Sequence, residues 1–286
     1  MKQNINHLNP AILKYEIVEG NKNKTQTMVI LHGLFCSKKT FKNFIEDPNV
    51  IGLLKNGILL DLRNHGESEK RDTMSYEEMA YDVINCLNIL NIKENIILLG
   101  HSIGGKIAMQ LSIIKPKMFS HVIVIDVAPI DMNKHKDKFP FIPFMTKLIN
   151  DLIFLNYNKD YEYIFQKILA LCKPENYNLA VAICDNLEKI DDNHYKMRLD
   201  LENILKNYFI LVGNITYNEL YERFNGKVKI ICGKESNGVQ PEFFSSFESV
   251  FSNNQNIIEF IPNSKHWVHL DQPDLFRQAV CEFLNN

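Results

Sequence analysis

The sequence has 286 residues, of which 45% are hydrophobic and 23% are charged, and its 32 Lys and Arg against 34 Asp and Glu give a formal net charge of −2. This near-neutral balance argues against electrostatic nucleic-acid binding, which requires a basic field. No apolar run approaches the roughly 18 residues of a transmembrane helix. Residues 1–10 are polar and contain no apolar signal core. We therefore expect a cytoplasmic protein with no integral membrane segment.

Short apolar runs bounded by turn residues recur along the chain with helical stretches between them, which is typical of a parallel α/β sheet. The runs that we expect to form strands are 12–18 at an edge of the sheet, 28–31, 58–62, 96–99, 122–127, 228–232 and 257–261. Apolar spacing predicts helices at 76–90, 103–114, near 241–250 and near 274–283, with a short one near 40–45. The expected fold class is α/β, with a mostly parallel central sheet flanked by helices.

This alternation of strands and helices breaks once, at residues 131–216. The apolar spacing there is helical, for example in 145–152, 161–171 and 179–187, and no strand of the parallel type is recognisable. We therefore predict a single α/β core made of residues 1–130 and 217–286, interrupted by a helical lid at 131–216.

The most informative motif is Gly100-His101-Ser102-Ile103-Gly104-Gly105, a G-x-S-x-G between a predicted strand and a predicted helix. A serine on such a tight turn is held in a strained backbone conformation, and the flanking glycines let neighbouring chain pass closely. The turn also directs the backbone N–H of Ile103, at a helix N-terminus, towards developing negative charge. The motif predicts Ser102 as a nucleophile. The plain alternative is a glycine-rich loop with an N-capping serine.

A serine hydroxyl needs a base to remove its proton. His266 lies just past the last predicted strand, at the carboxyl edge of the sheet that also carries Ser102. His269 is the rival candidate, with a structural role at a helix start as its alternative. We favour His266 because it comes closer to the end of the strand.

Two positions can supply the acid that orients this histidine. Asp126 ends the strand that follows the strand–turn–helix unit of Ser102, and adjacent strands lie about 4.8 Å apart, within reach of a histidine. Glu235, with Ser236 beside it, follows the strand at 228–232. We favour Asp126 because it starts from a rigid strand and keep Glu235 as the alternative acid.

The loop His32-Gly33-Leu34-Phe35 follows the strand at 28–31. An H-G-x-x loop at this place can supply a second oxyanion donor beside Ile103. We expect the donor to be the backbone N–H of Leu34, with that of Phe35 as the less favoured choice.

The stretch 139–145 is unusually apolar for a connection. It can line an acyl pocket under the lid, since small-molecule sites are concave and mostly apolar, or it can pack the lid onto the core. The pattern favours neither. Phe141 and Phe144 from this stretch, together with Phe35 and Trp267 beside the predicted oxyanion loop and base, are the candidate pocket residues.

The six cysteines are scattered and form no C-x-x-C motif or Cys/His cluster at zinc-ligand spacing, so neither a disulfide framework nor a structural metal is indicated. The sequence also lacks G-x-G-x-x-G, G-x-x-x-x-G-K-[ST] and H-E-x-x-H. We therefore expect a protein that requires no cofactor and no metal.

With these motifs in place, the chain resembles the α/β-hydrolase family over nearly its whole length. It is similar to the branch of small bacterial acyl esterases and abhydrolase domain-containing protein 11 in four segments. These are His32-Gly33-Leu34-Phe35, the loop at 61–66, the G-x-S-x-G motif followed by Lys106, and Val124-Ile125-Asp126 followed by Pro129. The resemblance implies an esterase or thioesterase with Ser102 as nucleophile and His266 as base. It also favours Asp126, because that branch has a serine, here Ser236, where other relatives keep a later acid.

We therefore predict a serine hydrolase that cleaves small acyl esters or thioesters through an acyl-enzyme, with Ser102, His266 and Asp126 as its triad. The expected partner is a small-molecule acyl ester or thioester, and the expected assembly is a monomer or small homo-oligomer. Two alternatives stay open. One is a non-catalytic or single-turnover binding protein for small ligands on the same fold. The other is a perhydrolase or lyase that uses the same triad.

Overall fold

The computed structural model describes residues 9–173, 176–218, 221–252 and 257–285. Its centre is a seven-stranded sheet in the order β1-β3-β2-β4-β5-β8-β9. The strands are β1 (Tyr15–Glu19), β2 (Thr27–Leu31), β3 (Asn56–Leu60), β4 (Ile96–His101), β5 (Phe119–Ile125), β8 (Lys227–Gly233) and β9 (Ile258–Ile261). Neighbouring strands are parallel except for β1, which pairs antiparallel with β3.

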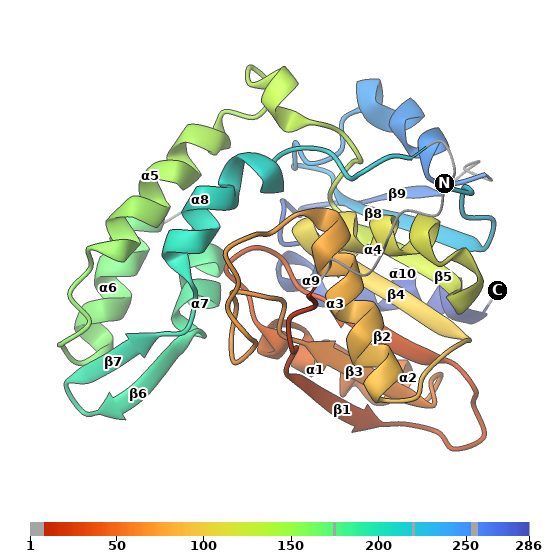
Figure 1. The fold of residues 1–286 in the computed structure, drawn as a ribbon, viewed down its shortest axis with the longest axis horizontal. Helices are drawn as coiled ribbons and strands as arrows, with labels where there is room; N and C mark the ends of the chain where they lie inside the picture. Colours follow the sequence, from red (N-terminus) through yellow and green to blue (C-terminus); the bar gives the residue numbers. More distant parts are fainter. Residues whose placement is uncertain (1–8, 174–175, 219–220, 253–256, 286) are drawn as a thin grey trace.

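Helices cover both faces of this sheet (Figure 1). One face packs against α3 (Tyr76–Ile89) and α4 (Ile103–Ile114), and the other against α1 (Lys42–Ile45), α2 (Pro48–Ile51), α9 (Val268–Asp271) and α10 (Pro273–Asn285). Successive side chains of a strand point to opposite faces. In β2, Val29 and Leu31 accordingly belong to the first core, and Met28 and Ile30 belong to the second. Both faces of the strands are apolar, as a sheet covered on both sides requires.

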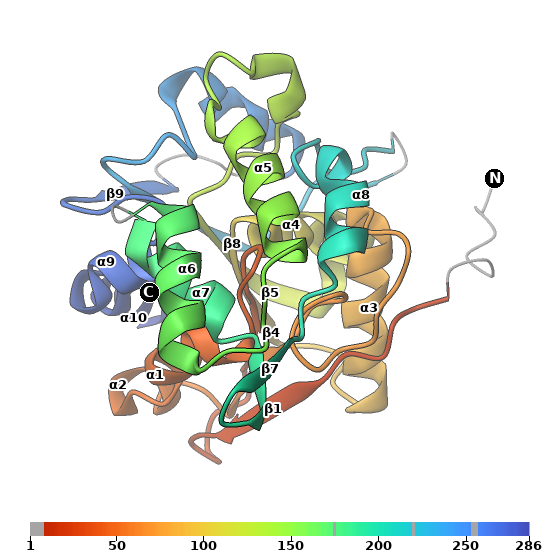
Figure 2. The same cartoon turned by 90° about the vertical axis from the view of Figure 1, so that its left-hand side faces the viewer.

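Between β5 and β8, which are neighbours in the sheet, the chain makes an excursion that we call the insertion (residues 131–216). It contains α5 (Phe141–Ile153), α6 (Tyr161–Cys172), α7 (Tyr177–Cys184) and α8 (Leu201–Leu211). In Figure 1 the insertion lies to the left of the core, and in Figure 2 it faces the viewer.

The insertion also contains an antiparallel hairpin of β6 (Leu187–Asp191) and β7 (His194–Met197), where the apolar spacing predicts only helices. The helix expected at 179–187 ends at Cys184, and Leu187 begins the hairpin. The two strands are polar and partly or fully exposed. They therefore lack the apolar runs by which the sheet strands are recognised.

Other predicted elements differ from the structure mainly at their ends. Helix α4 has the bounds expected from the sequence, whereas the element at Pro241–Ser249 is a 3₁₀ helix. Strand β5 ends at Ile125 because the next residue, Asp126, takes a left-handed backbone conformation with φ of 53° and leaves the strand. Strand β1 begins at Tyr15, whereas the sequence-based prediction places its start at residue 12.

All six cysteines are free and five of them are buried. Burial raises the pKa of the Cys36 thiol to about 12. The Cys36 thiol therefore stays protonated at neutral pH, and its Sγ lies 3.7 Å from the Leu34 carbonyl oxygen. Among the described residues, no helix is both long and apolar enough to cross a membrane.

Candidate active site

Ser102 lies on the turn between β4 and α4, with a left-handed φ of 54°. Its N–H donates to the carbonyl of Ile125 at 3.1 Å, which extends the sheet pairing by one residue. A Cβ at Gly104 would lie only 2.2 Å from the Leu31 carbonyl oxygen, so glycine is what allows α4 to begin against the end of β2. This turn holds the Ser102 side chain at the carboxyl edge of the sheet, where it lines a cavity.

Asp126 directly follows β5, as Ser102 directly follows β4, and it too has a positive φ. Its N–H donates to the carbonyl of Ile231 at 3.0 Å, and its side chain is fully buried. The carboxylate accepts hydrogen bonds from the Gly233 N–H, which lies 3.1 Å from Oδ1, and from the Ser236 hydroxyl at Oδ2. A Cβ at Gly238 would lie 2.5 Å from Oδ2. The loop after β8 therefore encloses the carboxylate and fixes its orientation.

His266 contacts this carboxylate, with its Nδ1 at 2.8 Å from Asp126 Oδ2. A carboxylate accepts the hydrogen, so in the neutral ring Nδ1 carries the proton and Nε2 keeps its lone pair. The ring is 41% exposed and lines the same cavity as Ser102. Among the described residues no hydrogen bond joins the Ser102 hydroxyl to His266. Such contacts often tighten only when substrate is bound.

His269, the rival base, makes no contact with Asp126 among the described residues. Its ring is buried and stacks on Phe41 with 4.2 Å between the ring centroids. Neither ring nitrogen has a hydrogen-bond partner within the described part of the chain. Burial lowers the pKa of His269 to about 3, which keeps it neutral. His269 thus packs as an aromatic side chain.

Glu235, the alternative acid, is exposed to solvent at the rim of the cavity. Its backbone N–H donates to the Ser264 carbonyl at 2.9 Å. Within the described residues its carboxylate has no hydrogen bond or ion pair with His266. The structure therefore brings His266 together with Asp126 and not with Glu235.

His101, immediately before Ser102, packs against His266 and bonds to its backbone. Its Nε2 donates to the His266 carbonyl oxygen at 2.9 Å, and the two ring centroids lie 4.7 Å apart. Burial holds the pKa of His101 well below its usual value, so the ring is neutral. We did not single out this residue from the sequence, although its place inside the G-x-S-x-G motif was the available signal.

The loop at residues 32–35, which we call the oxyanion loop, contains the two N–H groups that are candidates for the second oxyanion donor. The structure distinguishes between them. The N–H of Phe35 donates to Nε2 of His65 at 3.3 Å. The N–H of Leu34 has no acceptor within the described residues, and that of Ile103, as the first residue of α4, has no partner inside its helix. Leu34 and Ile103 both line the cavity. Two backbone donors are therefore available next to Ser102.

Phe35 itself is not a pocket residue, contrary to the sequence-based expectation. It has a φ of 65°, and its side chain is fully buried in the core and does not line the cavity. Phe141, Phe144 and Trp267 do line the cavity. Nothing in the local sequence of the loop indicated the positive φ of Phe35.

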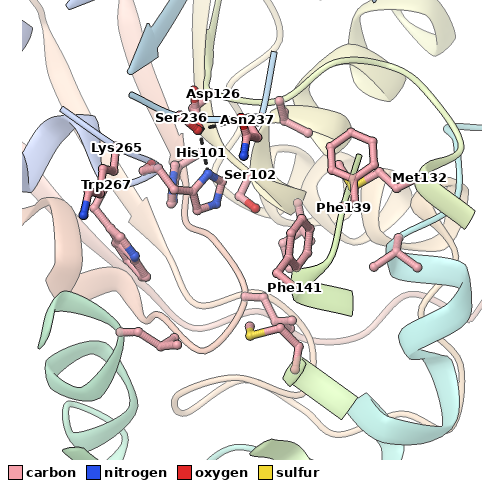
Figure 3. Close-up of a pocket in the computed structure, with 18 of the residues that line it drawn as sticks. His101, Ser102, Asp126, Met132, Phe139, Phe141, Ser236, Asn237, Lys265 and Trp267 are labelled. Atoms are coloured by element: carbon pink, nitrogen blue, oxygen red, sulfur yellow. Dashed lines mark hydrogen bonds and ion pairs between the residues drawn. The ribbon is translucent and has the colours of Figure 1, made fainter. Parts of the chain in front are cut away.

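The cavity has a volume of about 420 Å³ and lies between the carboxyl edge of the sheet and the insertion. Figure 3 shows Ser102 and Asp126 on one side of it and Met132, Phe139 and Phe141 on another. Most of its wall is apolar, contributed by Leu34, Tyr76, Met132, Phe139, Phe141, Phe144, Met145, Leu179, Tyr208, Leu211, Val212 and Trp267. The described residues contain no group of three or more His, Cys, Asp or Glu side chains placed to hold a metal ion.

Helix α4 also holds both ends of the insertion. The buried Lys106 donates from Nζ to the carbonyl of Ile130 at 2.9 Å and to that of Gly213 at 2.5 Å. One turn further on, Gln110 donates to the Thr216 carbonyl at 3.1 Å and accepts from the Thr216 N–H at 2.7 Å. Burial lowers the pKa of Lys106 to about 7. The helix that begins beside Ser102 therefore fixes where the insertion leaves and rejoins the core.

Comparison with known proteins agrees with this architecture. Residues 26–273 match the family described as alpha/beta hydrolase fold. The chain is 27% identical to sn-1-specific diacylglycerol lipase ABHD11 of Danio rerio, covering 96% of this chain and 83% of that protein. It is 25% identical to esterase YbfF of Escherichia coli (strain K12), covering 93% and 96% respectively. Among solved structures, a marine microorganism esterase superposes with a TM-score of 0.80 at 25% identity, covering 96% of this chain and 99% of the other. The chain belongs to the alpha/beta hydrolase fold family.

Proposed function

We propose that this protein is a serine esterase that cleaves carboxylic esters or thioesters of small, largely apolar acyl groups. The observation that carries the proposal is the 2.8 Å contact between His266 Nδ1 and Asp126 Oδ2 in a cavity that Ser102 also lines. The relatives named as lipases and esterases support the reaction class. The apolar wall of the cavity supports the substrate class, and its volume lies within the roughly 300–1,000 Å³ of small-molecule sites.

In the first half of the reaction, His266 Nε2 removes the proton of the Ser102 hydroxyl while Oγ attacks the carbonyl carbon of the substrate. The carbonyl π electrons move onto oxygen, and the backbone N–H groups of Leu34 and Ile103 donate to the resulting oxyanion. Asp126 holds the ring in the tautomer whose Nε2 can accept this proton and stabilises the imidazolium that forms. The tetrahedral intermediate then collapses, His266 returns the proton to the leaving alcohol or thiol, and an ester with Ser102 remains.

In the second half, water takes the place of the leaving group. His266 removes a proton from the water while the water oxygen attacks the carbonyl carbon of the acyl-enzyme. The same backbone donors stabilise the second oxyanion. Collapse of that intermediate breaks the bond to Ser102 Oγ, which recovers its proton from His266. The free acid leaves, and each residue returns to its starting protonation state.

The proposal is tested with purified protein, a fluorophosphonate probe and a matched pair of substrates, p-nitrophenyl butyrate and S-phenyl thiobutyrate. We expect steady-state hydrolysis and covalent labelling of the wild type, and loss of both in Ser102→Ala. Equal labelling of Ser102→Ala would contradict the assignment of the nucleophile. A burst of p-nitrophenol with no steady state would favour the single-turnover binding protein instead. The ratio of the two rates tells whether esters or thioesters are preferred.

A further inference from the structure

Both backbone polar groups of Phe35 are held by buried side chains from outside the oxyanion loop. Its N–H donates to Nε2 of His65, from the loop after β3, at 3.3 Å. Its carbonyl oxygen accepts from Nδ2 of Asn186, in the insertion, at 2.8 Å. Phe35 has a φ of 65°, a conformation that is unfavourable for a residue with a side chain. Such a conformation persists only where the surrounding contacts enforce it.

His65 is suited to this contact in one tautomer only. Its Nδ1 lies 2.9 Å from the Arg63 carbonyl oxygen, which can only accept, so Nδ1 carries the hydrogen. Nε2 then has the lone pair that the Phe35 N–H requires. Burial lowers the pKa of His65 to about 3. The ring therefore stays neutral, and the contact persists, throughout the neutral pH range.

Asn186 links three segments of the chain. Its side chain is fully buried. Oδ1 accepts from the Gly66 N–H at 3.1 Å, and Nδ2 donates to the carbonyls of Phe35 at 2.8 Å and of Ala182 at 3.0 Å. Only a side chain with both an acceptor and a two-proton donor can make this set. Asn186 thereby joins the insertion to the loop after β3 and to the oxyanion loop.

We propose that Asn186 and His65 are positioning residues for the oxyanion hole, so that the insertion completes the hole in addition to covering the cavity. The proposal rests on the esterase function proposed above. Leu34, whose N–H has no acceptor among the described residues, directly precedes Phe35. With the N–H and carbonyl of Phe35 both tied away from the cavity, the loop cannot rotate about Phe35. The Leu34 N–H is therefore kept at the cavity wall before substrate arrives.

The chain contains a matched control for Asn186. Asn207, on α8 of the insertion, is also buried and makes the same three kinds of bond. Its Oδ1 accepts from the Met74 N–H at 3.2 Å, and its Nδ2 donates to the carbonyls of Asp72 at 2.8 Å and of Asn203 at 2.8 Å. It thus fastens the insertion to the core with equal chemistry, but within the described residues it makes no hydrogen bond to the oxyanion loop; its neighbours Tyr76 and Tyr208 contribute only to the apolar wall of the cavity.

The kinetic test compares Asn186→Leu with Asn207→Leu on p-nitrophenyl butyrate. We expect Asn186→Leu to lower kcat about 10²-fold with little change in KM, the size expected for loss of one oxyanion donor, while Asn207→Leu stays within about threefold of wild type. A trifluoromethyl ketone that forms the tetrahedral adduct should bind Asn186→Leu more weakly, and butyrate should bind it as before. If both asparagine variants lose kcat equally, Asn186 is only a structural residue and the inference is overturned.

A second measurement does not depend on activity. Amide hydrogen exchange followed by NMR should show the Phe35 N–H protected in wild type and in Asn207→Leu, and exposed in His65→Leu and Asn186→Leu. Asn186→Ala replaces Asn186→Leu if the latter does not fold. Protection of Phe35 that survives in the Asn186 variant would overturn the inference even if the esterase is active. An inactive wild type would refute the proposed function, and the exchange of Phe35 would still decide whether Asn186 holds the loop.

Discussion

Ser236 donates its hydroxyl to the carboxylate of Asp126 from the loop that follows the neighbouring strand. The bond reaches Oδ2, the oxygen that also faces His266 Nδ1. Glu235, one residue earlier in the same loop, is exposed. The loop after β8 therefore contributes a hydroxyl that orients a buried carboxylate, and the carboxylate itself comes from the end of β5.

The first prediction concerns the acid. Asp126→Asn should lower kcat by about 10³–10⁴-fold, because an amide no longer selects the productive tautomer of His266. Glu235→Gln serves as the control and should change kcat by no more than about threefold. Both are measured by steady-state hydrolysis of a p-nitrophenyl ester. A crippled Glu235→Gln beside a mildly affected Asp126→Asn would make Glu235 the acid.

The second prediction concerns Ser236. Ser236→Ala removes a hydrogen bond to a buried carboxylate and leaves the Gly238 N–H, which donates to the serine at 3.0 Å, without its acceptor. We expect the free energy of unfolding to fall by about 1.5–3 kcal/mol, the usual size for a bond to a charged group. Urea denaturation measures the change. An unchanged transition midpoint would mean that the carboxylate is held adequately without the hydroxyl.

The third prediction concerns the acyl pocket. Phe141→Ala and Phe144→Ala enlarge the cavity on the side formed by α5, so the preferred p-nitrophenyl ester should shift to a longer acyl chain. Phe154, directly after the same helix, is 84% exposed and does not line the cavity. Phe154→Ala should leave the chain-length profile unchanged. If none of the three variants shifts the profile, Phe141 and Phe144 only pack the insertion.

The fourth prediction concerns stability in acid. Burial lowers the pKa of His65 and of His269 to about 3, so each is neutral when folded and takes a proton when unfolded at any pH between about 3 and 6.5. Because the unfolded state binds more protons in this window, stability falls as pH decreases, by about 1.4 kcal/mol per pH unit for each such histidine.

The histidine that tests this best is His269, because its ring nitrogens bind nothing in the described structure and its ring stacks on Phe41. His269→Phe should keep the stacking and remove one titrating group. The loss of unfolding free energy between pH 7 and pH 5 should shrink by about 2 kcal/mol relative to wild type. Urea denaturation at both pH values measures it. Parallel curves for the two proteins would show that His269 is not held neutral.

The fifth prediction concerns the ends of the insertion. Lys106→Met leaves the carbonyls of Ile130 and Gly213 without their donor, so both connections should open more often. Chymotrypsin should then cut the insertion several-fold faster than in wild type under native conditions. Lys147→Met, at an exposed position on α5, is the control. Equal cutting rates in all three proteins would show that the connections are held by packing alone.

The parts of the site that the sequence predicted are local in the chain. The elbow at Ser102 and helix α4 depend on a strand, a turn and a helix that follow one another directly, and their residue types are characteristic. The 140 positions between Asp126 and His266 left Glu235 open as a rival, since order along the chain alone does not decide which acid reaches the ring.

The parts of the structure that the sequence did not predict depend on contacts between distant segments or on the sign of a backbone φ. Asn186 lies 151 positions from Phe35 in a segment without a recognisable motif, so no pattern indicated it. Phe35 lies in the core with a positive φ, and the side chains bonded to its backbone, His65 and Asn186, come from distant segments. The hairpin β6–β7 has polar, exposed strands that give no apolar signal.

The insertion has a consequence for how the chain folds during synthesis. Asp126 and Gly233, which bond to each other, lie 107 positions apart, so β5 leaves the ribosome long before its neighbour β8. Until then the half-built sheet has an unpaired edge, which favours association with other chains. Helix α4 is complete by that stage and presents Lys106 and Gln110, which bind the returning chain at Gly213 and Thr216. These two side chains can act as a docking template that brings β8 into register before the triad is assembled.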